Sequence, residues 1–153
     1  MVANEKVVTI DRPIYEVFDY VSDPLNIPHW QAGFSDVRLI SASPLGVGTR
    51  FTSVRKFMGR KSQADIEFTD FKLNKKIAFK SVTGSTPFEE LFLFEPADRG
   101  TRLTVRLGLQ PSGLLGLAKP LIASGLKREV DEDIDILKET IETRVVENFE
   151  LVE

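Results

Sequence analysis

The sequence predicts a single α+β domain over residues 1–153, in which a curved antiparallel sheet of about seven strands wraps on a long C-terminal helix. Two observations predict it. Residues 34–109 alternate extended runs with short turns that contain Gly, Pro or Asn, and the last part of the chain carries an apolar stripe at helical spacing. A chain of this length buries enough surface to fold without a disulfide or a metal.

The chain begins with a predicted strand at residues 5–11, EKVVTID, followed by two short helices. Asp11 is expected to cap the first helix, with Pro13 in the first turn, where its missing N–H costs nothing. This helix should end near residue 23, because the residue before a proline is displaced from the α region. Residues 24–30 are compatible with a second helical turn. The apolar face of the first helix comprises Ile14, Val17, Phe18 and Val21.

The pattern of residues in the middle of the chain predicts six further strands, which form an antiparallel meander. In the last of these strands apolar and polar residues alternate, so we expect one face of the sheet to be buried and the other to be exposed to solvent. The six runs are FSDVRLISAS, TRFTSVRKF, SQADIEFTDFK, IAFKSV, FEELFLFE and TRLTVRLGL.

The end of the chain predicts a long amphipathic helix, the only element long enough to cover the apolar face of the sheet. Its stripe comprises Val130, Ile134, Leu137, Ile141 and Val145. The stretch before it, residues 114–126, is apolar nearly all round, and Gly116, Pro120 and Gly125 are expected to interrupt or bend it. Gly113, Gly116 and Gly125 would suit a mobile cavity gate, or equally a close packing contact.

Composition excludes several kinds of chemistry. The chain has no cysteine and one histidine, so thiol redox chemistry and the usual zinc sites are excluded, and we expect no metal and no cofactor. No apolar run approaches the roughly 20 residues of a membrane span, and no leader is visible, so we expect a soluble, cytoplasmic protein. Phosphate-binding, dinucleotide-binding and nucleophile-elbow motifs are absent from the sequence.

Basic residues are concentrated in one part of the chain. Residues 50–80 contain nine basic and three acidic residues, a net charge of +6 within a chain of net charge −3. The excess could mark an anionic partner, such as a lipid headgroup or RNA, or it could reflect the solvent faces of strands. We favour the strand faces and expect no nucleic-acid partner, because no arginine–aromatic recognition motif accompanies the charge.

Several motifs together resemble the START-like superfamily, also called SRPBCC, in its polyketide cyclase/dehydrase branch. VTIDRPIYEVFDYVSDPLNIPHW resembles the family opening, with Arg12 in place of the usual alanine and Trp30 at the tryptophan position. GVGTRF resembles its second hairpin, DRGTRLTV its last strand and DILKETIE its terminal helix. The likeness covers about residues 3–145. It implies the helix-grip fold, with a deep, mostly apolar cavity between sheet and helix.

The cavity of this family gives a set of candidate ligand-binding residues. We expect Trp30 to pack where the short helices meet the sheet, at the rim of the cavity. The expected apolar lining, which could equally be ordinary core, comprises Phe68, Phe79, Leu103, Val105 and Leu107 from the sheet and Leu121, Ile122 and Leu126 from the helix.

Charged residues that are adjacent within strands are candidates for polar groups inside the cavity. Glu89 and Glu90 must face opposite sides of the sheet, and the same holds for Arg55 and Lys56. Arg55 faces in if Phe51 and Phe57 do, whereas Lys56 faces in if Val54 and Met58 do. An inward charge needs a partner, and an inward pair would anchor the polar end of a ligand. Alternatively these residues lie at strand ends and bend to solvent.

Acid–base candidates are few. His29, Tyr15 and Glu90 are the weak candidates for catalysis, although a histidine after Pro28 in a turn is more often exposed and a tyrosine on a helix flank more often packs. Eleven phenylalanines against two tyrosines favour apolar burial.

Three functions fit these observations. The leading one is binding or transport of a small hydrophobic or amphipathic ligand, such as a lipid or polyketide, by a monomer or homodimer with at most transient membrane contact. The alternative is a polyketide cyclase or dehydratase using the same cavity. The third is a protein-interaction module, which should show a filled interior and an exposed apolar patch.

Overall fold

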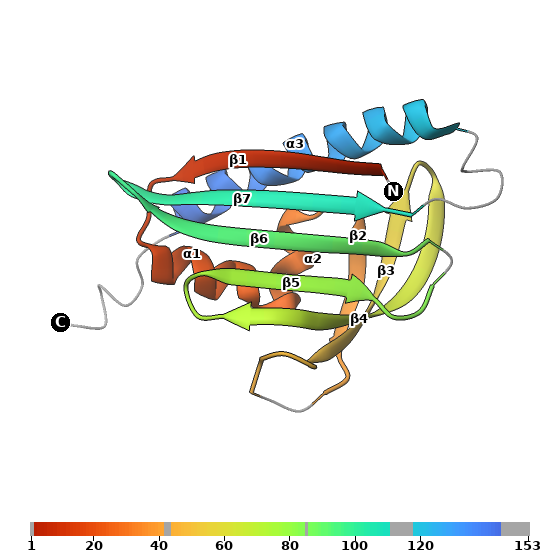
Figure 1. Ribbon diagram of the computed structural model, residues 1–153, viewed down its shortest axis with the longest axis horizontal. Helices are drawn as coiled ribbons and strands as arrows, with labels where there is room; N and C mark the ends of the chain where they lie inside the picture. Colours follow the sequence, from red (N-terminus) through yellow and green to blue (C-terminus); the bar gives the residue numbers. More distant parts are fainter. Residues whose placement is uncertain (1, 42–43, 85, 111–117, 145–153) are drawn as a thin grey trace.

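In the computed structural model, which describes residues 2–41, 44–84, 86–110 and 118–144, seven strands form one antiparallel sheet (Figure 1). The order across the sheet is β1-β7-β6-β5-β4-β3-β2, so the predicted meander is confirmed, with the first strand paired to the last. The strands are β1 Val2–Ile10, β2 Phe34–Leu39, β3 Arg50–Phe57, β4 Arg60–Lys72, β5 Lys76–Ser81, β6 Phe88–Ala97 and β7 Gly100–Leu109.

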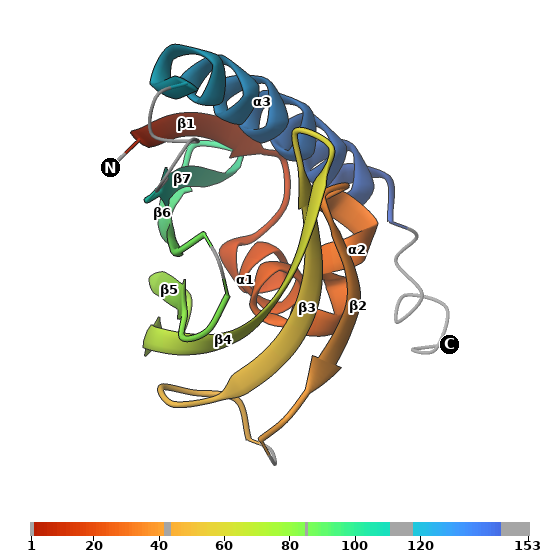
Figure 2. The ribbon, with the colours of Figure 1, turned by 90° about the vertical axis from the view of Figure 1, so that its right-hand side faces the viewer.

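The helices lie within and across the curve of this sheet. The sheet wraps around the short helices α1 and α2, and the long helix α3 lies across the opening between the β1 edge and α2, as Figure 2 shows. This arrangement is the predicted helix-grip fold. The helices are α1 Ile14–Ser22, the 3-10 turn η1 Pro24–Asn26, α2 Ile27–Trp30 and α3 Lys119–Thr143. None of the described helices is long and apolar enough to cross a bilayer.

Two local predictions about the helices are wrong. Asp11 does not cap α1, because Pro13 occupies the cap position and no side-chain hydrogen bond closes the helix there. Pro120 and Gly125 do not interrupt α3. Pro120 lies in its first turn, where proline is tolerated, and Gly125 packs against the side chain of Met58, 3.4 Å from the sulfur to the position a Cβ would take. Gly113, Gly116 and Val145 lie outside the described residues.

Aromatic rings fill the space between the sheet and the helices. Phe68 stacks on Phe79 with ring centroids 5.9 Å apart, and Phe51 meets both rings edge-on. Trp30 in α2 meets Phe92 of β6 at 5.8 Å with its ring nearly perpendicular. Because these rings interlock in favourable edge and stacked geometries, they act as a packed core that joins sheet and helices.

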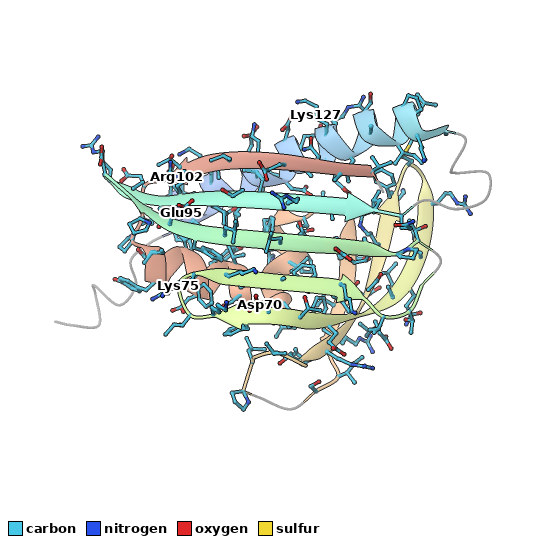
Figure 3. The ribbon with its side chains drawn as sticks, viewed as in Figure 1. Asp70, Lys75, Glu95, Arg102 and Lys127 are labelled. Carbon is cyan, nitrogen blue, oxygen red and sulfur yellow. The ribbon has the colours of Figure 1, made fainter. Side chains whose placement is uncertain are left out.

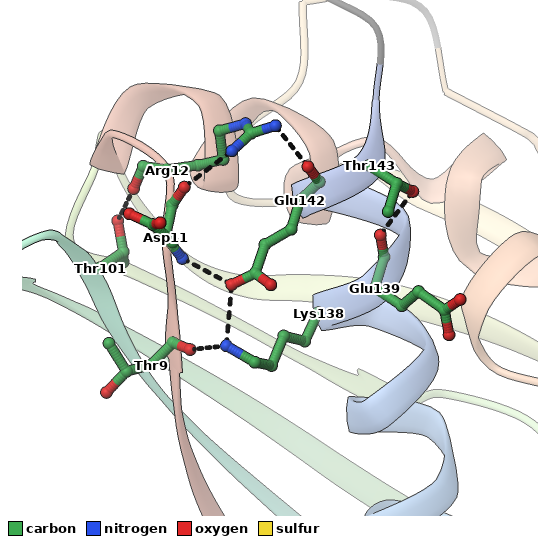
Figure 4. Close-up of polar contacts among 8 residues, drawn as sticks. All are labelled: Thr9, Asp11, Arg12, Thr101, Lys138, Glu139, Glu142 and Thr143. Atoms are coloured by element: carbon green, nitrogen blue, oxygen red, sulfur yellow. Dashed lines mark hydrogen bonds and ion pairs between the residues drawn. The ribbon is translucent and has the colours of Figure 1, made fainter.

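A polar cluster ties the end of α3 to the connection between β1 and α1 (Figure 4). The Glu142 carboxylate accepts hydrogen bonds from the Asp11 backbone N–H and from Lys138 Nζ, both at 2.8 Å. Lys138 also donates to the Thr9 carbonyl oxygen, and the guanidinium of Arg12 donates to the Glu142 carbonyl oxygen. Arg12 therefore holds the C-terminal turn of α3.

Replacing Glu142 with alanine should destabilise the protein by about 1 kcal/mol, because two partners of a half-exposed carboxylate are lost. Urea unfolding measures this change. Glu139→Ala is the matched control, since Glu139 is exposed one turn earlier on the same helix, and it should stay within about 0.5 kcal/mol of the wild type. Equal losses in both variants would contradict a specific contribution of this cluster, since alanine is itself the best helix former.

Candidate functional site

The strand register brings charged side chains into the interior. Phe51, Ser53 and Arg55 share the inner face of β3, so Arg55 points inward and Lys56 outward. On β6 the inward residue is Glu90, whereas Glu89 is exposed. Arg55 is 5% exposed and Glu90 only 3%. The alternative in which these residues bend to solvent at strand ends is therefore wrong.

Five side chains form a buried polar cluster: Gln31 directly after α2, Arg55, Glu90, and Glu129 and Asp133 from α3. Its strongest contact is the ion pair between Arg55 Nη2 and Glu129 Oε2, 2.5 Å apart. Glu129 and Asp133 are four residues apart, so one face of α3 presents both carboxylates to the sheet. Among the described residues, no group of three His, Asp or Glu side chains is placed to hold a metal ion.

Arg55 is enclosed by aromatic rings as well as by its carboxylate partner. Its guanidinium carbon lies 5.4, 5.0 and 5.8 Å from the ring centroids of Phe34, Phe57 and Phe88. These distances allow cation–π attraction, which strengthens where water is excluded. The Arg55 Nε–H has no hydrogen-bond partner within the described part of the chain. One donor of this buried cation therefore lacks a partner there.

Burial raises the pKa of two carboxyl groups of the cluster, those of Glu90 and Asp133, toward neutral pH. Burial raises the pKa of Glu90 to about 8, with Arg55 opposing and Asp133 adding to the rise. Burial and the neighbouring Glu129 raise the pKa of Asp133 to about 7, although the Ala32 N–H at 3.3 Å favours its carboxylate. Burial also raises the pKa of Glu129, against the pull of Arg55. The cluster therefore combines one permanent cation with carboxyls able to exchange protons near pH 7.

A pocket opens beside Arg55, between the β3–β4 hairpin, the start of β6 and the start of α3. We call it the mouth pocket; its volume is about 190 Å³. A dry cavity of roughly 150 Å³ accommodates benzene, so the space suits a small ring or a short chain. Its lining comprises Arg55, Phe57, Met58, Arg60, Lys61, Ser62, Ala64, Gly84, Thr86, Phe88, Leu109, Ala118 and Ile122.

Two of the predicted ligand-binding residues, Arg55 and Ile122, line the mouth pocket. Trp30 is buried at the junction of α2 and the sheet. The prediction that Leu121 belongs to the apolar lining is wrong, because its side chain is 66% exposed. Ile122 faces the interior, and consecutive residues of a helix point about 100° apart, so Leu121 faces away from it. The other six are buried in the core and do not line the mouth pocket: Phe68, Phe79, Leu103, Val105, Leu107 and Leu126.

Two of the three acid–base candidates lie on the surface. Tyr15 is 58% exposed on α1, and His29 is exposed on α2. Neither belongs to the buried polar cluster, whereas the third candidate, Glu90, lies within it.

His29→Ala should leave the free energy of unfolding within about 0.5 kcal/mol of the wild type, because the side chain is exposed and forms no hydrogen bond with the residues that the structure describes. Ligand binding should also be unchanged. Thermal unfolding and a binding titration check both; a clear loss of binding would give His29 a role that its position does not explain.

Sequence reasoning missed Gln31, Glu129 and Asp133. A signal existed for the two acidic residues, since Leu126, Val130, Ile134 and Leu137 define the buried face of α3, and positions 129 and 133 adjoin that face. An acidic residue at such a position predicts a partner inside the fold. No comparable signal marks Gln31, which follows the end of α2.

Solved structures share this fold at low sequence identity. TTHA0849 from Thermus thermophilus is 20% identical and has a TM-score of 0.76, with 92% of this chain and 95% of that chain covered. A START superfamily protein from Mycobacterium smegmatis is 15% identical, with a TM-score of 0.75 and coverage of 92% and 97%. The Zhui aromatase/cyclase from a Streptomyces species is 15% identical, with a TM-score of 0.74 and coverage of 93% and 94%.

No curated protein sequence matches this chain. The profile of one family, described as polyketide cyclase/dehydrase and lipid transport, matches residues 1–142. This match covers every described strand and nearly all of α3. The chain therefore belongs to the polyketide cyclase/dehydrase and lipid transport family.

Proposed function

We propose that the protein binds a small amphipathic ligand in the mouth pocket, with the apolar part of the ligand against Phe88 and Ile122 and an acceptor oxygen on Arg55. One observation carries this proposal: Arg55 is buried in the pocket wall, and its Nε–H lacks a partner in the described part of the chain while Nη2 is held by Glu129. A buried donor without a partner costs free energy, which a ligand oxygen would recover.

The chemistry of the pocket selects the ligand class. Phe57, Phe88 and Ile122 offer apolar and aromatic surface, and Arg55 offers a cationic donor at one side. Carboxylates, ketones and phenols attached to a ring or a chain match this arrangement. Family membership and the shared fold of a START superfamily protein and an aromatase/cyclase support a hydrophobic ligand of this kind.

The size of the pocket limits how much of the ligand it holds. At about 190 Å³ it is smaller than the 300–1,000 Å³ of sites that enclose a drug-sized molecule. The outer wall is formed by exposed side chains, Met58, Arg60 and Lys61, which are able to move without unpacking the core. We infer that the pocket takes the polar end or first ring of a longer molecule.

Filling the pocket tests this function. Ala64 is buried and lines the mouth pocket, so Ala64→Leu should reduce affinity for 1-naphthoate, a probe that joins a ring to a carboxylate, at least tenfold in calorimetric titrations. Ala78→Leu is the matched control on the outer face of β5 and should bind like the wild type. Unchanged binding in Ala64→Leu would contradict the site. Native mass spectrometry of the purified protein would identify the natural occupant.

The acid–base character of the cluster favours a second candidate, proton-transfer catalysis on a bound ketone. Asp133, with its pKa near 7, lines a second hollow of about 310 Å³ between α3 and the chain after α2. Its carboxylate would take a proton from the carbon next to the carbonyl, and the enolate would then regain one.

Deuterium exchange into acetonaphthone in D2O tests this activity. The rate of exchange at the methyl group should exceed the rate in buffer alone when the wild type or Glu132→Gln is present, but not when Asp133→Asn is present. Exchange at the buffer rate with all three proteins would exclude this activity for the probe.

A further inference from the structure

Two segments that meet at the mouth pocket carry basic residues and no acidic ones. Residues 54–64 of the β3–β4 hairpin and residues 118–128 at the start of α3 contain no Asp or Glu, although the whole chain has a net charge of −3. Apart from the buried Arg55, all of their basic side chains are exposed. We call these exposed residues the basic rim: Lys56, Arg60, Lys61, Lys119, Lys127 and Arg128.

The two segments lie side by side in space. Met58, at the tip of the hairpin, packs against Gly125 of α3, and both segments contribute to the wall of the mouth pocket. Figure 2 shows the β3–β4 hairpin rising beside α3. The basic rim therefore extends from the opening of the mouth pocket, which Arg60 and Lys61 line, to the second hollow, which Lys56 and Arg128 line.

Most of these charges have no partner in the described part of the protein. Of the basic rim, only Lys127 forms an ion pair there, with Asp131 at 2.8 Å. Elsewhere on the sheet several basic side chains are paired, as Arg50 is with Glu67, Lys76 with Asp70 and Arg106 with Glu5. Lys56 and Arg128 share the second hollow with Glu132, whereas Arg60, Lys61 and Lys119 lie in segments without acidic residues. Like charges repel one another, so an anionic surface that covers them stabilises the group.

Two large apolar side chains project among the charges. Met58 is 52% exposed and Leu121 is 66% exposed, from the hairpin and from the first turn of α3. Met58 also has a positive φ of 51°, as does Gly59 at 80°, in the two-residue turn between β3 and β4. Asn or Asp is the usual residue at the first position of such a turn, so the conformation of the turn does not explain a methionine there.

We propose that the basic rim, with Met58 and Leu121, docks the mouth of the pocket onto an anionic phospholipid bilayer. Lysine and arginine side chains attract acidic headgroups, while the two apolar side chains enter the boundary with the acyl chains. Single-stranded nucleic acid is the other polyanion that could bind a basic surface, but proteins that bind it use exposed aromatic side chains on which the bases stack. The one aromatic residue of the two segments, Phe57, instead packs against Arg55.

This docking has a consequence for the pocket. Met58, Arg60 and Lys61 belong both to the docking surface and to the pocket lining, so contact with a bilayer would bring the opening of the pocket against the lipid. The bilayer proposal does not depend on which ligand the pocket takes, because the charges and the two apolar side chains lie outside the binding contacts to Arg55.

Vesicle flotation of the purified protein tests the docking. Binding is expected to vesicles of 70% phosphatidylcholine and 30% phosphatidylglycerol, not to pure phosphatidylcholine, and to weaken as salt rises. Arg60→Ser with Lys61→Ser should lower the partition coefficient by about fivefold per charge removed. Met58→Ser with Leu121→Ser should weaken the binding that remains at high salt. Both double variants alter exposed side chains, and circular dichroism would verify their fold.

Lys75→Ser with Arg102→Ser is the matched control, since both residues lie at the end of the molecule away from the hairpin (Figure 3). This variant removes the same number of charges and should bind vesicles like the wild type. If the control and the Arg60→Ser, Lys61→Ser variant lose vesicle binding equally, the proposed docking surface is wrong. Binding of the wild type to neutral vesicles alone would also contradict it. If the protein instead binds a single-stranded RNA more tightly than anionic vesicles, and loses that binding when the basic rim is substituted, the partner of this surface is a nucleic acid and not a bilayer.

Discussion

Glu90→Gln is expected to remove a large part of the decline in stability that the wild type should show as pH rises from about 4.5 to 8. Burial raises the pKa of Glu90 from 4.5 to about 8, so in this window the folded protein keeps a proton that the unfolded chain releases. The unfolded state is therefore stabilised relative to the folded state as pH rises. The free energy of unfolding falls until the pH exceeds the pKa of Glu90 in the folded protein. Each unit of pKa difference between the folded and the unfolded state corresponds to about 1.4 kcal/mol, so the effect is on the order of several kcal/mol. Glutamine is neutral in both states, so its contribution does not change with pH.

Urea unfolding of wild type and variant at intervals from pH 4.5 to 8.5 measures this difference. Glu89→Gln is the matched control, because Glu89 is the neighbouring residue on β6 and points to the outer face. The control should retain the wild-type slope. Part of the slope should survive in Glu90→Gln, because Asp133 contributes a decline of the same sign between about pH 3.8 and 7. Parallel curves for wild type and Glu90→Gln would show that Glu90 is ionised in the folded protein.

Glu129→Leu is expected to cost about 3 to 5 kcal/mol of stability at neutral pH. The Arg55 guanidinium stays charged at any accessible pH, so removal of its 2.5 Å partner leaves a cation inside the protein. Asp133 and Glu90 would ionise to compensate, since Arg55 already favours their charged forms. The loss should therefore be larger at pH 5, where both are protonated, than at pH 8.

The double variant Arg55→Met with Glu129→Leu isolates the cause. It should recover most of the stability, because an apolar pair of similar volume avoids burying any charge. Glu132→Leu, on the exposed side of the same helix, should change stability by less than about 0.5 kcal/mol. A double variant no more stable than Glu129→Leu would mean that packing around α3, and not the unpaired cation, accounts for the loss. Chemical denaturation at pH 5 and pH 8 separates these outcomes.

The strands and the long helix were predictable because local patterns carry their information. Alternation along residues 101–109 defined which face of β7 is buried, and the stripe through Val130 and Leu137 defined the buried face of α3. The turn between β3 and β4 was marked by Met58-Gly59-Arg60, since glycine accepts a positive φ. Asp11 shows the limit of such reasoning, because its backbone N–H binds Glu142, 131 residues away.

The candidate site was predictable only in part. Strand periodicity showed that one of Arg55 and Lys56 and one of Glu89 and Glu90 must face inward, but it left open whether these residues bend to solvent near the strand ends. The lining of the pocket was predicted less well, because an apolar residue in a core and one in a cavity wall give the same pattern. Leu121 and Ile122 differ only in their direction around α3, which depends on where the helix begins.

The amino-acid sequence alone was enough to establish the class of fold, because period-two and period-3.6 patterns follow from backbone geometry within each element. It also showed that the two residues of each adjacent charged pair lie on opposite faces of the sheet. The tertiary structure decided which inward charges meet. Arg55, Glu90 and Glu129 come from β3, β6 and α3, and only the curvature of the sheet under the helix brings them together. The pKa values near 7 and 8 arise from that convergence, since burial and neighbouring charge are properties of the folded surroundings and not of any single segment.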